Sequence, residues 1–153
     1  MSYKPTVPKS LILRMFQKFQ NHLTTRFPQL KDQKLLLALS GGVDSCVLLD
    51  LCLKSGLTPA VAHCNFQLRG SVSDADADWI KNLADSKGLE SHVQTFETQV
   101  YAQEKKISIQ MAARDLRYQW FESLSQQKGY DSILIAHHAD DALETFMINA
   151  MRG

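Results

Sequence analysis

Lys34 to Leu53 reads KLLLALSGGVDSCVLLDLCL, and its hydrophobic period changes midway. Leu35–Leu39 is an unbroken apolar run, which is typical of a strand buried on both faces of a parallel sheet. The residues Ser-Gly-Gly at 40–42 interrupt this run, because adjacent glycines permit backbone angles that other residues resist. From Val43 onward the apolar residues recur at helical spacing. The segment therefore predicts a strand, a tight turn and a helix.

The predicted junction between strand and helix has the features of a phosphate-binding turn. Backbone N–H groups converge at a helix N-terminus, where the helix dipole favours negative charge, and Ser40 and Ser45 add hydroxyl groups. The segment lacks the lysine of a Walker A loop and the three glycines of a dinucleotide fingerprint. The hexapeptide SGGVDS, residues 40–45, instead resembles the SGGxDS pyrophosphate loop of the N-type ATP pyrophosphatases.

Asp44 lies inside this hexapeptide and suggests a role for a cation. A carboxylate beside a polyphosphate repels it unless a cation such as Mg²⁺ lies between the two groups. The alternative is that Asp44 and Ser45 only cap the following helix. The position of the hexapeptide between a strand and a helix favours the phosphate-binding interpretation.

The composition predicts one soluble globular domain. The chain has 153 residues, of which 44% are hydrophobic and 22% charged, so it is long enough to bury a core. Its three cysteines, Cys46, Cys52 and Cys64, form no CxxC pair and are expected to be reduced thiols. No apolar run approaches the length of a membrane span, and residues 1–10 lack the apolar core of a signal peptide. We expect a cytoplasmic protein with no membrane segment.

Strands and helices are predicted to alternate along the chain. This order predicts an α/β fold in which helices flank a parallel sheet. The expected helices are Ser10–Arg26, a helix from Val43 that Gly56 closes, Asp74–Lys87, a helix spanning Ile109 and Leu124 that Gly129 ends, and Ala139–Met151. The expected strands are Leu35–Leu39, Thr58–His63, Leu89–Phe96 and Ser132–Ala136, with a loop over Cys64–Ser73.

The net charge is only +1, but its distribution is uneven. Residues 1–34 carry seven Lys or Arg residues against Asp32, and such a basic face could contact RNA phosphates or could simply be solvated. The acids Asp74, Asp76 and Asp78 do not fit a calcium loop, because Trp79 replaces its required glycine. We expect these acids to cap the N-terminus of a helix, where the dipole favours them.

Polar residues follow several predicted strands, at the edge where open α/β sheets bind ligands. His63 ends the second strand, and Asn65 and Arg69 lie in the loop beyond it. If a helix begins near His137, then Asp141 and Glu144 share one helical face with it. An imidazole and two carboxylates suit Mg²⁺ binding, polyphosphate contact or proton transfer. The alternative is that these groups only satisfy the helix dipole, but the nearby phosphate loop favours function.

Arg114 and Arg117 lie one turn apart on a predicted helix. An arginine on a helix that faces the cleft could hold phosphates bidentately. From spacing alone, a surface ion pair with Asp115 or Glu122 is the more probable interpretation.

Four segments together resemble the tRNA(Ile)-lysidine synthetase family. They are SGGVDS, AHCNFQLRG, QMAARDLRYQWF and IAHHADDALETFMINAMRG, and the resemblance covers Leu35 to Gly153. It implies an adenine nucleotide α-hydrolase-like three-layer sandwich, the PP-loop ATPase fold. It also implies adenylation of the wobble cytidine of tRNA-Ile with a CAU anticodon by ATP. The amine of L-lysine then displaces AMP and gives lysidine.

The resemblance also implies which residues form the site. The catalytic residues are expected to be Asp44, Arg114, His137, Asp141 and Glu144. Mg²⁺ is expected at Asp44 and Asp141. The ATP-binding residues are expected to be Ser40, Gly41, Gly42, Val43, Asp44, Ser45, His63, Asn65, Arg114 and His137.

The family's enzymes continue beyond the arginine and glycine with which this sequence ends. We therefore expect residues 1–153 to be a truncated N-terminal PP-loop ATP-binding domain that lacks the C-terminal tRNA-binding domains. Two alternatives stay open. One is a tRNA thiolation enzyme of the same superfamily, which is expected to use cysteines, often in CxxC pairs. The other is a non-catalytic ATP-binding fragment.

Overall fold

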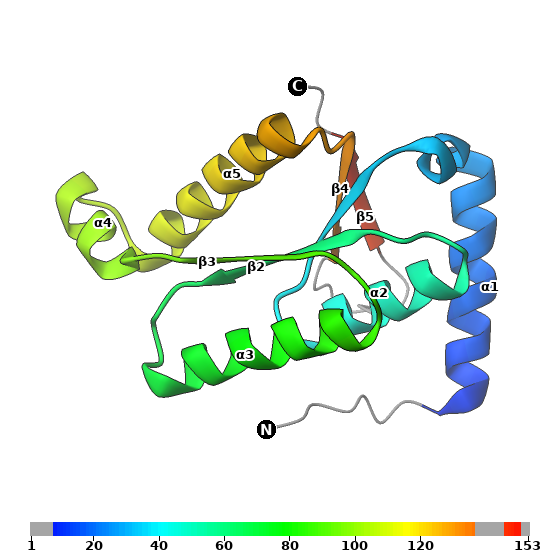
Figure 1. Cartoon of the computed structure of the whole chain (residues 1–153), viewed down its shortest axis with the longest axis horizontal. Helices are drawn as coiled ribbons and strands as arrows, with labels where there is room; N and C mark the ends of the chain where they lie inside the picture. Colours follow the sequence, from blue (N-terminus) through cyan, green and yellow to red (C-terminus); the bar gives the residue numbers. More distant parts are fainter. Residues whose placement is uncertain (1–7, 137–145, 151–153) are drawn as a thin grey trace.

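The sheet has five strands in the order β3-β2-β1-β4-β5 (Figure 1). The computed structural model describes residues 8–136 and 146–150. The first four strands in this order are parallel, and β5 pairs antiparallel with β4. The strands are β1 Leu35–Ala38, β2 Ala60–Asn65, β3 Ser91–Thr95, β4 Ser132–Ala136 and β5 Phe146–Ala150.

Helices cover both faces of the sheet and make a three-layer α/β sandwich (Figure 1). Helices α1, α2 and α3 pack on one face, and α5 packs on the other. Among the described residues the helices are α1 Lys9–Arg26, α2 Val43–Lys54, α3 Ser71–Ser86, α4 Thr98–Lys105 and α5 Ile109–Lys128, with a 3-10 helix, η1, at Pro28–Asp32.

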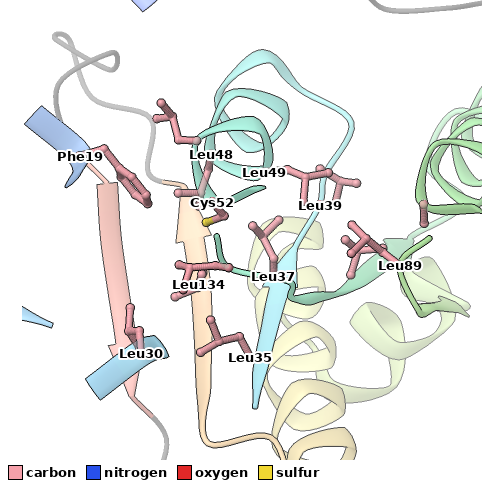
Figure 2. Packing of buried hydrophobic residues seen from close by; sticks show 14 of the residues in the cluster. Phe19, Leu30, Leu35, Leu37, Leu39, Leu48, Leu49, Cys52, Leu89 and Leu134 are labelled. Carbon is pink, nitrogen blue, oxygen red and sulfur yellow. The ribbon is translucent and has the colours of Figure 1, made fainter. Parts of the chain in front are cut away.

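The leucines of β1 alternate between the two layers of helices. Leu35 and Leu37 belong to the cluster that contains Leu48 of α2 (Figure 2). Leu36, which is 0% exposed, packs instead with Phe121 of α5. Strands β2 and β4 flank β1 with parallel hydrogen bonding. The prediction of a strand buried on both faces is confirmed. Neighbouring strands flank β1 at both edges, and helices cover both of its faces.

The predicted fold class is confirmed, with small shifts in the element bounds. Strand β2 continues to Asn65, because Cys64 and Asn65 pair with β3. Helix α3 begins at Ser71, three residues before the predicted start, so the predicted loop is shorter at both ends. Helix α4 was not predicted, because its eight residues carry no clear hydrophobic period.

The predicted helix Ala139–Met151 is wrong over Phe146–Ala150, which form the edge strand β5. Strand β4 offers backbone groups along the edge that β1 does not use, and β5 hydrogen-bonds with them in an antiparallel register. Pairing with the free edge of the preceding strand overrides the local preference of these residues for a helix. Residues 139–145 and 151–153 of the predicted helix lie outside the described residues.

Within the described residues, no helix combines the length and apolar character that a membrane crossing requires.

Candidate functional site

The turn between β1 and α2 is fixed by a chain of hydrogen bonds that runs through two serines. The Ser45 hydroxyl donates its one proton to the carbonyl oxygen of Gly42 at 3.2 Å. In the 3.0 Å bond between the two serine hydroxyls, Ser40 is therefore the donor and Ser45 Oγ the acceptor. Ser40 Oγ in turn accepts from the Gly42 N–H at 3.2 Å. The predicted phosphate-loop residues are thus brought together in one turn, and Ser45 is buried within it.

This turn presents the N-terminus of α2 without a side-chain cap. Gly42 is the N-cap residue and has no side chain with which to form a capping hydrogen bond, and Asp44 lies in the first turn of the helix. The first bond back to the turn is donated by Cys46 N–H to Gly42 O at 3.2 Å. The N–H groups of the first helical turn precede this bond, and the helix dipole at this end favours an anion.

Gly41 gives the turn its shape. Its φ of +90° lies in the region that side chains rarely adopt, and an added Cβ would lie 4.0 Å from Ile80 Cδ1 of α3. The space is therefore adequate, and the backbone angle is the reason for glycine.

A cavity of about 340 Å³ opens beside the turn, over the carboxyl ends of β1, β2 and β4. Its size is within the range of small-molecule sites. The cavity lies at the topological switch point, because the chain leaves β1 toward β2 and leaves β4 toward β5. Its lining residues include Ser40, Ser45, His63, Cys64, Asn65, Phe66, Leu68, Arg69, Asp76, Arg117, Phe121 and Ala136.

His63 lines this cavity from the end of β2. Its Nδ1–H donates to the carbonyl oxygen of Leu39 at 2.8 Å, which leaves Nε2 as the ring nitrogen available to a ligand. Burial lowers the pKa of His63, against the smaller opposing effects of the Leu39 hydrogen bond and the Asp76 charge. At neutral pH the ring is therefore neutral, and Nε2 is a hydrogen-bond acceptor.

Asn65 also lines the cavity, but both ends of its amide are engaged within the protein. Nδ2 donates to Asp74 Oδ1 at 2.8 Å, and Oδ1 accepts from the Gln67 N–H at 3.0 Å. The expectation that the acids of α3 occupy the first turn of a helix is confirmed for Asp74 but not for Asp76 and Asp78, and Gly70, the N-cap residue, forms no side-chain capping bond. Asp74 binds Asn65, and Asp76 forms an ion pair with Arg69 at 3.0 Å.

The two arginines of α5 have different environments. Arg117 lines the cavity, with its guanidinium over the Phe66 ring at 5.6 Å. Arg114 is exposed and outside the cavity lining, with its guanidinium over the Tyr118 ring at 5.3 Å. Among the described residues neither arginine forms an ion pair with Asp115 or Glu122. Sequence reasoning selected Arg114 for the site, whereas the described cavity contains Arg117.

The three cysteines are protonated at neutral pH. Burial raises the pKa of Cys46 to about 11 and that of Cys52 to about 12. Cys64 lines the cavity, and burial raises its pKa to about 12 although Arg117 acts in the opposite direction. A protonated thiol is a poor nucleophile, so the cavity provides no activated cysteine among its described residues.

The predicted residues His137, Asp141 and Glu144 lie outside the described residues. Ala136, at the end of β4, lines the cavity. Within the residues that the structure describes, no group of three His, Cys, Asp or Glu side chains is placed to hold a metal ion. This does not conflict with Mg²⁺ at Asp44, since the ion is often held by one or two carboxylates together with substrate phosphates and water.

The sequence model of a family described as "PP-loop domain" matches residues 13–153, and the chain belongs to this family. This membership supports the use of ATP by the domain.

The chain is similar to proteins named tRNA(Ile)-lysidine synthase. It is 48% identical over 124 residues to the one from Bacteroides thetaiotaomicron, covering 81% of this chain and 29% of that protein. It is 45% identical over 122 residues to one from Porphyromonas gingivalis, covering 80% of this chain and 27% of that protein. The chain thus spans less than a third of the length of these relatives.

Two solved structures share the fold. The NH3-dependent NAD synthetase from Campylobacter jejuni superposes with a TM-score of 0.57 at 16% identity, covering 83% of this chain and 54% of that one. The NMN synthetase from Francisella tularensis gives a TM-score of 0.57 at 19% identity, covering 86% and 54%. These similarities support the predicted adenine nucleotide α-hydrolase-like fold.

Gly41→Ala tests the turn. We expect it to weaken Mg-ATP binding at least tenfold and to lower the free energy of unfolding by about 1–2 kcal/mol, because alanine is strained at positive φ. Gly56→Ala is the matched control, since Gly56 has a φ of +84° and lies beyond the far end of α2. It should lose similar stability and bind Mg-ATP normally. Calorimetric titration and chemical denaturation of both variants provide the measurement, and equal losses of binding would contradict the assignment.

Arg117→Ala and Arg114→Ala decide which arginine serves the nucleotide. Loss of a charge-assisted hydrogen bond costs about 1.5–3 kcal/mol, so Arg117→Ala should weaken ATP binding by about ten- to a hundredfold. Arg114→Ala should weaken it less, because its side chain lies outside the cavity lining. Dissociation constants for Mg-ATP measure both effects. The opposite order would support the original prediction of Arg114.

Proposed function

We propose that this chain is the ATP-using part of an enzyme that attaches lysine to the wobble cytidine of tRNA-Ile with a CAU anticodon. The observation that carries this proposal is the 48% identity over 124 residues to a protein named tRNA(Ile)-lysidine synthase. The SGGVDS turn and the adjoining cavity support it, because they provide an anion site beside a space for a small molecule.

The proposed reaction has two displacement steps. In the first, O2 of the cytidine attacks the α-phosphorus of ATP, the bond to the β-phosphate breaks, and pyrophosphate leaves. In the second, the lysine amine attacks C2 of the adenylated cytidine, AMP leaves with the former O2, and the amine loses a proton. The products are lysidine, AMP and pyrophosphate.

The described residues around the cavity have separate roles in the proposed reaction. The turn of residues 40–45 holds the pyrophosphate portion at the N-terminus of α2, and the bonds between its two serines fix the shape of the turn. Arg117 meets the phosphate at which the first displacement occurs, since its guanidinium lines the cavity. Bound Mg²⁺ at Asp44 would neutralise the phosphate charge. His137, Asp141 and Glu144 stay predictions, since they lie outside the described residues.

His63 has a defined role in this proposal. Its Nδ1 is used by Leu39, so its neutral Nε2 can accept a hydrogen bond from a hydroxyl group of the nucleotide. This orients the nucleotide without adding a positive charge at the floor of the cavity.

Transfer of labelled lysine to a tRNA transcript with a CAU anticodon tests the proposed function. We expect incorporation that depends on Mg-ATP and releases AMP and pyrophosphate. A transcript whose wobble cytidine is replaced by uridine is the matched control and should accept no lysine. ATP binding without AMP formation would favour a non-catalytic module. AMP formation without lysine transfer would favour another base-activating enzyme, such as a thiolation enzyme.

Asp44→Asn tests the proposed magnesium site. The variant keeps the size of the side chain and removes its charge, so we expect the fold to persist while Mg²⁺-dependent ATP turnover falls at least tenfold. Circular dichroism checks the fold, and titration of Mg²⁺ at fixed ATP measures the loss. Asp50→Asn is the control, because Asp50 lies on α2 in an exposed ion pair with Lys54. Unchanged turnover by Asp44→Asn would contradict the assignment of Asp44 to the magnesium site.

A further inference from the structure

The loop between β2 and α3, residues 66–70, forms part of the cavity wall and contains a strained residue. Phe66, Leu68 and Arg69 line the cavity from this loop. Gln67, between them, has a φ of +54°. A residue other than glycine rarely adopts this conformation, which persists only where the surrounding structure imposes it.

Two buried polar side chains, Asn65 and Thr98, hold the loop from two sides. Asn65, which is 3% exposed, accepts the Gln67 N–H at 3.0 Å and donates to Asp74 on α3 at 2.8 Å. Thr98 on α4 is also buried, and its hydroxyl donates to the carbonyl oxygen of Phe66 at 2.8 Å. Bonds from two buried side chains to the backbone of one short loop restrict its conformation. The loop therefore has a defined conformation.

The loop presents Arg69 at the mouth of the cavity. The Arg69 N–H donates to Ser73 Oγ at 3.1 Å, and its Nη2 donates to Asp76 Oδ2 at 3.0 Å. The side chain is still 70% exposed. A guanidinium that is oriented by one bond keeps further N–H donors for a ligand, and its planar donor set matches a phosphate group.

We infer that residues 66–70 form an RNA-contacting loop, in which Arg69 binds a backbone phosphate next to the target cytidine. Asn65 and Asp74 act as positioning residues that keep Arg69 at the cavity mouth. This inference rests on the proposed function. RNA is favoured over ATP because Arg69 is exposed at the rim, whereas the phosphate turn and Arg117 provide donors inside the cavity. A polynucleotide that inserts one base has phosphates on both sides of the opening.

Arg69→Ala and Asp76→Asn separate RNA contact from a structural ion pair. Arg69→Ala removes the bond and Asp76→Asn removes the charge of its acceptor, and because the pair is exposed both should change thermal stability little. Only Arg69→Ala should weaken binding of the CAU transcript, by roughly fivefold, and reduce the slope of log K against log salt by about 0.7–0.9. Asp76→Asn should keep or increase RNA affinity, because it retains Arg69 and removes a negative charge. Filter binding at several salt concentrations measures these effects.

Asp74→Ala and Asp74→Asn test the positioning role. Asp74→Asn retains a side-chain oxygen that can accept from Asn65, so its RNA affinity should stay near that of the parent. Asp74→Ala removes the acceptor and should lower RNA affinity by about as much as Arg69→Ala, because the loop loses its attachment to α3. The dissociation constant for Mg-ATP should change less than that for the transcript in both variants, because Asp74 itself is not among the residues that line the cavity.

Different results would overturn the inference and the proposed function. If Arg69→Ala binds the transcript as tightly as the parent, the inference is overturned. The same holds if this variant weakens Mg-ATP binding in place of RNA binding. Neither result contradicts the proposed function. An equal loss of RNA affinity in Arg69→Ala and Asp76→Asn also overturns it, in favour of a structural pair. A parent protein that binds Mg-ATP and no transcript contradicts the proposed function itself, and the inference falls with it.

Discussion

The burial of β1 on both faces is the constraint on which the rest of the structure depends. Leu35 and Leu37 face the helices α1 and α2, Leu36 faces α5, and the neighbouring strands occupy both edges (Figure 2). Each fully buried leucine contributes about 1.5–3 kcal/mol relative to exposure, and together they offset the strain of the turn that follows. A rigid strand end therefore allows Gly41 to keep its positive φ and the phosphate turn to keep its shape.

The local pattern of the sequence predicts the elements whose structure depends on local causes. The strand β1, the turn at residues 40–42 and the start of α2 follow from a change of hydrophobic period and a pair of glycines. The pairing of Phe146–Ala150 with β4 depends on the edge of β4 that β1 leaves free. The residues of this segment do not indicate that the edge of β4 is free. Their spacing therefore predicted a helix where the structure has a strand.

The candidate site shows the same limit at the level of side chains. Arg114 and Arg117 are three positions apart on α5, so they project from neighbouring directions on one helix. Spacing indicates that they are neighbours but not which one the cavity includes, because the rotation of α5 is fixed by Phe121 and Leu124 against the sheet. This packing includes Arg117 in the cavity lining and leaves Arg114 over Tyr118.

The polar groups around the cavity differ in how much bonding capacity they have left. Asn65 uses both ends of its amide within the protein, and His63 uses one ring nitrogen and leaves the other. Arg117 contacts the Phe66 ring, which orients the guanidinium without consuming its N–H donors. A polar residue beside a ligand is therefore not always a ligand contact. At this site the buried asparagine shapes the wall, and the half-buried arginine and the neutral histidine retain the capacity to bind.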